Sequence, residues 1–503
     1  MIGIKTIVFA SVFFGAALLA TEPNQETRRW WSHVQALAND GMEGRDTGSE
    51  GYRKAAGYVV RQFEQNGLKP AGDQGYAQTV PLHVVRLRGD RSTAVLTRDG
   101  RSKTLQWLRH ISVQPNTAVP RSIDAELVFV GSGNYATTVD VRGKIVVQMN
   151  PARIEGAQPA VLSTSPSGAV GLLGIDSPDG LEPPRWPAQY AVAMSLRGQS
   201  AATASALTLR FNPADAEMLF EGSGHTYKDL LNLFRQGRPL PSFSLTVQLR
   251  ATLAIEEEDI QSDNLIAIRP GSDPALAGEY VVVSAHLDGY GIGEPWNGDH
   301  IYNGAFDDAA YVATLIETAE RLQQSNTKLR RSIVFAVFTG EEKGLLGSRY
   351  FTQHLTVPRN QVVGNINLDQ VRPLFPLKKL TMIARDESTL GDAVRRVAEP
   401  MGIQVLADQE PWRNLIRRAD NWNFMQIGVP ATGFVLTPEK GTPDEAIYKE
   451  WYARRYHTPL DDLKQPWDPS AAAKFNDFFL RLLEAIANAD ERPQWKSGSS
   501  YAK

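Results

Sequence analysis

The 503-residue sequence contains no cysteine. This absence excludes disulfide bridges, a cysteine nucleophile, thiolate metal ligands and a lipid-anchored cysteine. A chain of this length can bury a core large enough to fold without disulfides, even in an oxidising compartment. Any metal site must therefore be built from histidine and carboxylate side chains, which suit zinc and other divalent ions.

The sequence also lacks a marked excess of charge of either sign. Basic residues number 53 and acidic residues 56, which gives a net charge of -3. A balance of this kind does not indicate a nucleic acid or an anionic membrane as partner. The hydrophobic content of 42% is normal for a globular protein, and the length suggests two to three domains.

Long hydrophobic runs are missing except near the N-terminus. Lys5 precedes a short apolar run over residues 6–20, and the polar stretch 21–24 follows it. A basic start, a short apolar segment and small residues at its end are typical of an export signal. We therefore predict a signal peptide over residues 1–20 and a secreted or periplasmic location, with an uncleaved anchor as the alternative. No membrane contact is expected beyond this segment.

The sequence pattern of the rest of the chain changes twice. Short alternating runs with Gly, Pro and Asp between them dominate from Gln78 to about Leu253 and predict a small β-rich unit. From Asn264, apolar strands alternate with amphipathic helices, which is typical of a sheet covered on both faces. The fold class is therefore α/β, a three-layer α/β/α architecture with a β-rich insert. The predicted units are residues 21–115, 116–255, 256–490 and a tail over 491–503, with the insert over 116–255.

Ligands bind at the carboxyl ends of strands in sheets of this class. The polar residues at these positions are therefore the candidates for a functional site. One strand over residues 280–286 ends in His286-Leu287-Asp288, and a second over 332–340 precedes Glu341-Glu342. The remaining candidates are Asp369 at the end of a third strand, Asp307 and Asp308 before a helix over 308–323, and His457 in a loop.

Each of these residues has an ordinary explanation when taken alone. A histidine at a strand end is usually a satisfied polar residue, a Glu-Glu pair is usually solvated, and Asp308 is most simply a helix N-cap. Asp461 and Asp462 in the loop after His457 fit the capping of a turn. Five His or carboxylate positions on one sheet edge weaken the ordinary explanation, because independent accidents would all have to coincide.

The local spacing also makes chemical sense. Residues two apart in an extended strand point the same way, so Asp288 can accept the second ring N–H of His286 and fix its tautomer. Adjacent residues point in different directions. One of Glu341 and Glu342 can therefore bind a metal ion while the other faces a water molecule as a base.

Six motifs in order carry a family resemblance. They are "AHLDGYG", "YNGAFDDAA", "FTGEEKGLLGSRYF", "NINLDQ", "RRADNWNFMQIGVPA" and "YHTPLDDL". Together they resemble the two-zinc aminopeptidase and glutamate-carboxypeptidase-like metallopeptidases. The segment 42–73 is similar to the N-terminal helical region of that family. The β-rich insert resembles a protease-associated domain through the strands "AELVFVGSG" and "VRGKIVV".

The resemblance implies a mixed sheet of zinc-exopeptidase type and two zinc ions per chain. It implies one zinc ion on His286, Asp307 and Asp369, and a second on Asp307, Glu342 and His457. Glu341 would be the general base that activates water for attack on a peptide carbonyl, and Asp288 would support the site from behind. The implied activity is exopeptidase hydrolysis of peptides, with an aminopeptidase as the first hypothesis.

Three departures from the family pattern and three other functions stay open. The departures are Ala310-Tyr311 and Ala419, where the family usually has Ser-Gly and Ser, and Gly289, where it often has Ser or His. A carboxypeptidase would need a cation for the substrate carboxylate, and the arginines that could supply it are Arg385, Arg413, Arg417 and Arg418. A glutaminyl-cyclase-like transferase or a non-catalytic binding protein are the remaining alternatives. The sequence does not indicate an oligomeric state.

Overall fold

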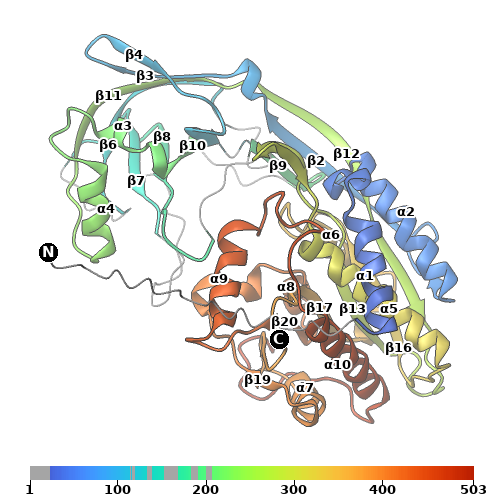
Figure 1. Ribbon diagram of the computed structural model, residues 1–503. Coiled ribbons are helices and arrows are strands. Elements are labelled where there is room, and N and C mark those ends of the chain that lie inside the picture. The colour runs from blue at the N-terminus through green and yellow to red at the C-terminus, as the bar shows by residue number, and fades with distance from the viewer. Residues whose placement is uncertain are drawn as a thin grey trace, which may run out of the picture.

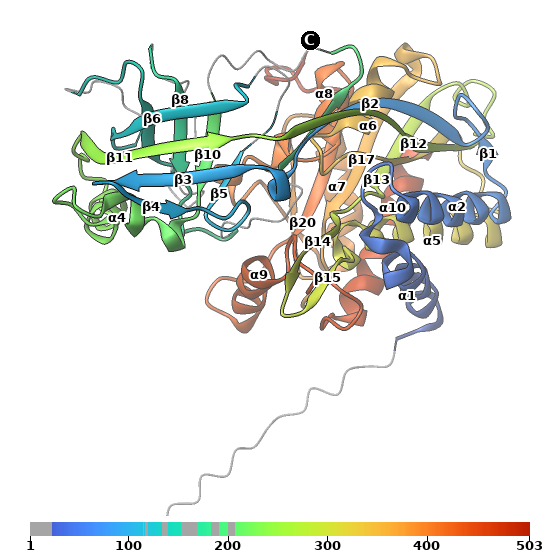
Figure 2. The ribbon, with the colours of Figure 1, turned by 90° about the horizontal axis from the view of Figure 1, so that it is seen from above.

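A computed structural model of the chain describes residues 23–113, 115, 119–132, 139–151, 168–182, 191–199 and 207–502. The predicted signal peptide over residues 1–20 lies outside these residues. Two sheets dominate the described part of the chain, and they form two units side by side (Figures 1 and 2).

The larger sheet has ten strands within the described residues. The strand order is β19-β18-β20-β17-β13-β16-β12-β2-β9, and β1 pairs with β12. The four central strands β16, β13, β17 and β20 are parallel, whereas β18 runs antiparallel to β20, and β12, β2 and β9 pair antiparallel. The sheet is therefore mixed, as predicted. Its strands are β1 (Lys69–Pro70), β2 (Ala77–Leu87), β9 (Val192–Leu196), β12 (Ile255–Arg269), β13 (Tyr280–His286), β16 (Ser332–Phe338), β17 (Val362–Gln370), β18 (Lys379–Met382), β19 (Gln404–Leu406) and β20 (Ala431–Leu436).

Helices cover both faces of this sheet, which confirms the three-layer prediction. Side chains alternate along a strand, so Val281 and Val283 join one core and Val282 joins another. The first core includes α1, α2, α5 and α10, and the second includes α6 and α8. The helices are α1 (Gln25–Ala38), α2 (Glu50–Gln65), α3 (Glu217–Phe220), α4 (Tyr227–Arg235), α5 (Ala310–Gln324), α6 (Leu346–Gln353), α7 (Leu390–Ala398), α8 (Asn421–Gln426), α9 (Pro443–Arg454) and α10 (Pro469–Asn488).

The smaller sheet forms the β-rich unit with its own core. Its strand order is β4-β3-β11-β6-β7-β8-β10-β5, and α3 and α4 pack against it. The long strands β2 and β12 run from one unit into the other (Figure 1). The strands of the smaller sheet are β3 (Thr93–Arg98), β4 (Arg101–Thr104), β5 (Ile111–Val113), β6 (Ser122–Phe129), β7 (Ile145–Met149), β8 (Gly171–Ile175), β10 (Leu207–Phe211) and β11 (Phe243–Thr252).

The boundaries of this unit differ from those predicted from the sequence pattern. Strands β3, β4 and β5 precede the predicted start at residue 116, yet they belong to the smaller sheet. Strand β9 lies inside the predicted insert, yet it pairs with β2 of the larger sheet. The alternation of apolar residues is alike in β2 and β3, so it cannot say which sheet a strand joins. Long-range pairing decides that.

The described residues contain no helix long and apolar enough to cross a membrane.

Glu317 in α5 gives a testable consequence of burial. Its side chain is fully buried, and neither carboxylate oxygen has a hydrogen-bond partner. Burial raises the pKa of Glu317 to about 7, and the guanidinium of Arg321 at 3.7 Å offsets only part of this effect.

The folded chain therefore holds a proton on Glu317 at pH values where the unfolded chain has lost it. The free energy of unfolding must then fall as pH rises from about 4.5 to about 7. In Glu317→Gln this loss is absent. We expect the variant to gain about 2 to 3 kcal/mol on the wild type between pH 5 and pH 8, measured by denaturant unfolding. A stability difference that does not change with pH would contradict this.

Candidate metal centre

Three parallel strands bring polar residues to one edge of the larger sheet. His286 ends β13, Asp369 lies next to the end of β17, and Glu341 and Glu342 follow β16. Because β13 pairs with both β16 and β17, these strand ends are neighbours. Parallel strands end at the same edge, which is why the sequence pattern placed these residues together.

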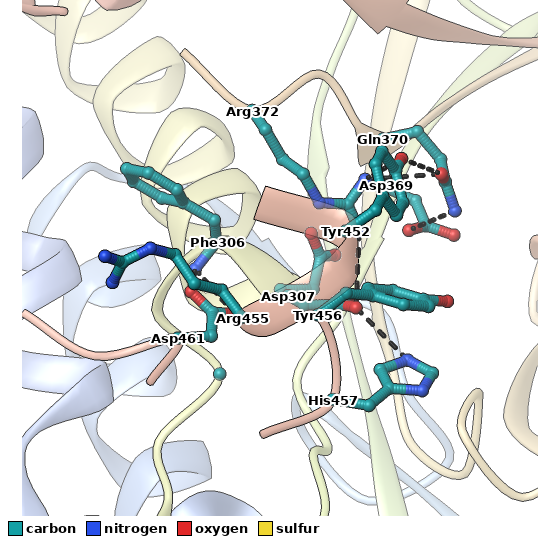
Figure 3. A network of polar contacts seen from close by, with 12 residues as sticks. Phe306, Asp307, Asp369, Gln370, Arg372, Tyr452, Arg455, Tyr456, His457 and Asp461 are labelled. Carbon is teal, nitrogen blue, oxygen red and sulfur yellow. Dashed lines mark hydrogen bonds and ion pairs between the residues drawn. The ribbon is translucent and has the colours of Figure 1, made fainter. Parts of the chain in front are cut away.

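Two other segments complete the cluster. Asp307 lies in a π-helical turn over Ala305–Ala309 just before α5, and His457 follows α9 with a positive φ of 56°. Figure 3 shows Asp307 between the side chains of Arg372 and His457. The Oδ2 atom of Asp307 lies 3.3 Å from His457 Nε2, and its Oδ1 atom lies 3.5 Å from His286 Nε2.

The structure brings these residues together in three groups of potential metal ligands. His286, Asp307 and Asp369 form one group, and Asp307, Glu342 and His457 form another. Within each group, one ligand atom per residue lies within 4.8 Å of the others. These two groups share Asp307 and have the same members as the two ligand sets that the resemblance implies. A third group joins His286 to Glu341 and Glu342.

The buried oxygens of the cluster fit divalent cations. Asp307 Oδ2, Asp308 Oδ1 and Glu342 Oε1 are buried without a hydrogen-bond partner. Buried carboxylate oxygens that lack hydrogen bonds are costly, and a cation compensates that cost. A donor set of imidazole nitrogens and carboxylate oxygens, with no sulfur, suits zinc.

The pKa values of the cluster show how strongly it repels further negative charge. Burial raises the pKa values of Asp308, Glu341 and Asp369, and neighbouring carboxylates add to the effect. Burial also raises the pKa of Glu342, to about 7. Asp307 is the exception, because the charge of Arg372 and the two histidines outweigh burial and hold its pKa well below the usual range.

Asp288 supports the site differently from the prediction. The His286 ring nitrogen Nδ1 lies 3.0 Å from the backbone carbonyl of Asp288, whereas the Asp288 carboxylate is 3.7 Å away. The carboxylate instead accepts hydrogen bonds from the backbone N–H groups of Glu341 and Glu342 at 3.0 and 3.3 Å. It also accepts one from the hydroxyl of Thr47. The chain leaves the strand after His286, so the strict two-residue alternation no longer applies there, and Asp288 orients the two glutamates instead.

Asp308 is not the N-cap that its position before a helix suggests. The first residue of α5 is Ala310, and no side chain caps it. The Asp308 carboxylate is fully buried and accepts a hydrogen bond of 2.9 Å from the backbone N–H of His286. The π-helical turn rotates this carboxylate away from the helix start and toward the strand end.

Asp461 holds the turn that carries Asp307. Its carboxylate accepts a hydrogen bond of 2.9 Å from the backbone N–H of Phe306, and its backbone carbonyl accepts one from Ala305. The turn-capping explanation of Asp461 from the sequence therefore applies, but the capped turn belongs to a distant segment.

Arg45 ties together the backbone under the cluster. It is fully buried and donates to four backbone carbonyls, among them Leu287 after β13 and the pair Asn303 and Gly304 before Asp307. Sequence reasoning did not single it out. The only signal was its place in the N-terminal segment that resembles the family.

Arg372 was also missed. Its guanidinium is buried, lies 3.2 Å from Asp307 Oδ2, and packs over the ring of Trp451 at 4.5 Å. Its backbone N–H donates to the hydroxyl of Tyr311. Tyr311, which is one of the departures from the family pattern, therefore accepts a hydrogen bond from the backbone of Arg372, the residue that pairs with Asp307.

The departure at Gly289 also has a structural reason. A Cβ atom at this position would lie 2.8 Å from the backbone oxygen of Gly44, which is too close for a side chain. Gly289 also donates its backbone N–H to Arg45. Ala419 is buried, and nothing in the structure explains why it replaces serine.

The comparison with protein families identifies the family of the segment that carries these residues. Residues 264–483 match the family described as Peptidase family M28. This segment belongs to peptidase family M28. All five proposed ligands and Glu341 lie inside the M28 segment.

Two curated proteins are similar to this chain over part of its length. Aminopeptidase YwaD of Bacillus subtilis (strain 168) is 26% identical over 228 residues, which cover 44% of each chain. Leupeptin-inactivating enzyme 1 of Streptomyces exfoliatus is 24% identical over 208 residues, which cover 40% of this chain and 43% of the relative. The aligned region thus spans less than half the length of either relative.

Solved structures extend the likeness in fold beyond the M28 segment. An aminopeptidase from Aneurinibacillus sp. strain AM-1 has a TM-score of 0.60 at 19% identity and covers 93% of this chain and 95% of its own. BSAP, a zinc aminopeptidase from Bacillus subtilis, has a TM-score of 0.60 at 17% identity, with 93% and 96% coverage. At such low identity this likeness establishes a common fold, which includes the β-rich unit.

Proposed function

We propose that this chain is a secreted zinc aminopeptidase that hydrolyses the N-terminal residue from peptides, with two zinc ions per chain. One observation carries the proposal. Two groups of His and carboxylate ligands share Asp307, and the carboxylate of Glu341 lies beside them, 3.9 Å from His286 Nε2. The aminopeptidase names of the relatives in family M28 support the same activity.

His286, Asp307 and Asp369 would hold one ion, and Asp307, Glu342 and His457 the other. When bound, zinc polarises a carbonyl group and lowers the pKa of water toward neutrality. Asp307 is the ligand that both groups share, and Arg372 keeps its carboxylate ionised and fixed in place.

Glu341 would act as general base and then as general acid. It would take a proton from the attacking water and deliver a proton to the leaving amine. Burial raises the pKa of Glu341, and a raised pKa suits a group that must gain and lose a proton near neutral pH. The Asp288 carboxylate accepts a hydrogen bond from the backbone N–H of Glu341 and so fixes the backbone from which the Glu341 side chain extends.

The arginines considered for a carboxypeptidase already have partners. Arg413 and Arg418 pair with Glu182, Arg385 pairs with the adjacent Asp386, and Arg417 packs over Trp422 at 4.8 Å. A substrate carboxylate would have to displace one of these contacts. The geometry therefore favours the aminopeptidase over the carboxypeptidase.

The test is a panel of substrate termini with the purified chain. We expect hydrolysis of leucine p-nitroanilide and of unblocked dipeptides, and no hydrolysis of the same dipeptides after N-acetylation. Chelation should abolish the activity and zinc should restore it, with two ions per chain by elemental analysis. Cleavage of only the blocked substrates, or full activity after verified metal removal, would overturn the proposal.

A further inference from the structure

A contact between the two units lies close to the candidate metal centre. Glu182 follows β8 in the β-rich unit, and its carboxylate pairs with two arginines of the M28 segment. The oxygen Oε1 lies 2.8 Å from Arg413 Nη2 and 2.9 Å from Arg418 Nη1, and Oε2 lies 2.9 Å from Arg418 Nη2. The pairing with Arg418 thus has the two-pronged geometry by which arginine recognises a free carboxylate.

The two arginines depend on Glu182 to different degrees. Arg413 is fully buried and also pairs with Glu410 at 2.7 Å, so its charge is balanced within the M28 segment. Among the described residues, Glu182 is the carboxylate that pairs with Arg418, and the other close polar contact of Arg418 is the hydroxyl of Tyr456 at 3.3 Å. Burial by itself would raise the pKa of Glu182, but the charges of Arg418 and Arg413 outweigh it and hold this pKa well below its usual range.

Tyr456 connects this pair to the metal centre. Its ring stacks on the ring of His457, with centroids 3.6 Å apart, while its hydroxyl contacts Arg418. A carboxylate held by Arg418 therefore lies one tyrosine side chain away from a proposed zinc ligand.

A cavity lies next to residues that surround this ion pair. A cavity of about 840 Å³ is lined by Leu181, next to Glu182, and by Glu410 and Tyr448, which both contact Arg413. The cavity thus borders residues that adjoin Glu182 in sequence or contact Arg413.

We propose that Arg418, backed by Arg413, is a carboxylate-binding subsite that Glu182 fills from within the chain. The inserted unit thereby selects against substrates that carry a carboxylate at this point. The inference rests on the proposed peptidase function, and it names the substrate class as peptides without a negative charge there. The excluded carboxylate is either an acidic side chain or the C-terminus of a short peptide.

The test compares charged and neutral substrate pairs on the zinc-loaded full chain. Glutamate and glutamine p-nitroanilides form the side-chain arm, and Leu-Gly and leucyl-glycinamide form the C-terminal arm. In Glu182→Gln we expect the ratio of kcat/KM for the charged over the neutral member to rise about tenfold or more in one arm, as one charge-assisted pair becomes available. Leucine p-nitroanilide carries no carboxylate, so its kcat/KM in each variant is the reference to which both arms are normalised.

Two further variants keep the result specific. Glu410→Gln removes the other carboxylate on Arg413 but leaves Arg418 paired, so its ratios should stay at the wild-type values. In the double variant Glu182→Gln/Arg418→Gln the gain should disappear.

Unchanged ratios in both arms, or a gain that survives without Arg418, would overturn the inference while leucine p-nitroanilide is still cleaved. A wild-type chain with zinc bound that cleaves no substrate would instead overturn the proposed function, and the two failures are therefore distinguishable.

Discussion

Replacing Glu341 by glutamine is expected to lower kcat about 10²- to 10⁴-fold, the usual contribution of a positioned general base. The amide has the same shape as the carboxylate but cannot take a proton. KM should change little, because the residue acts in the transition state more than in substrate binding. Steady-state kinetics on leucine p-nitroanilide measures both quantities.

Metal content distinguishes a base from a ligand in this variant. His286, Glu341 and Glu342 also form a group of potential ligands, so the position alone leaves both roles open. Two zinc ions per chain in Glu341→Gln would support the role of base, and the loss of one ion would support the role of ligand. Glu317→Gln is a matched control, since it removes a buried glutamate that lies in none of the ligand groups. Full activity of Glu341→Gln would contradict the proposed mechanism.

Replacing Asp307 by asparagine should have the largest effect on metal content. Asp307 belongs to both groups that the proposal assigns to zinc, and Arg372 holds its carboxylate in the ionised form. Asparagine is neutral and has only one carbonyl oxygen to offer. We expect elemental analysis to fall from two ions per chain to at most one, and kcat to fall at least about 10³-fold.

Neighbouring variants make this result specific to the shared position. Asp369→Asn and His457→Gln each alter one group only, so each should keep about one ion per chain. Asp308→Asn changes the adjacent carboxylate, which lies in none of the groups, and should keep two. Two tightly bound ions in Asp307→Asn would show that this residue does not bridge them.

The candidate site could be predicted from the sequence where it depends on strand ends. His286, Glu341, Glu342 and Asp369 follow or end buried strands, and parallel strands bring their ends to one edge whatever else the chain does. The strand over residues 280–286 was also predicted to the residue, because it is a short run of mostly apolar residues that ends in a histidine.

Residues whose local pattern is ordinary could not be predicted in this way. Arg45 and Arg372 are polar residues in irregular segments, and their burial becomes visible only when distant backbone closes around them. Asp288 and Asp308 were assigned partners from local spacing, which fails where the backbone leaves regular geometry.

The sequence by itself determined the α/β class, the absence of thiolate ligands and the set of His and carboxylate residues at the sheet edge, because these follow from composition and from periodicity along the chain. Only the tertiary structure decided where the smaller sheet begins, which partner each buried carboxylate has, and that Glu182 reaches Arg418. Those features depend on contacts between segments far apart in sequence, and the local pattern of either segment carries no information about the other.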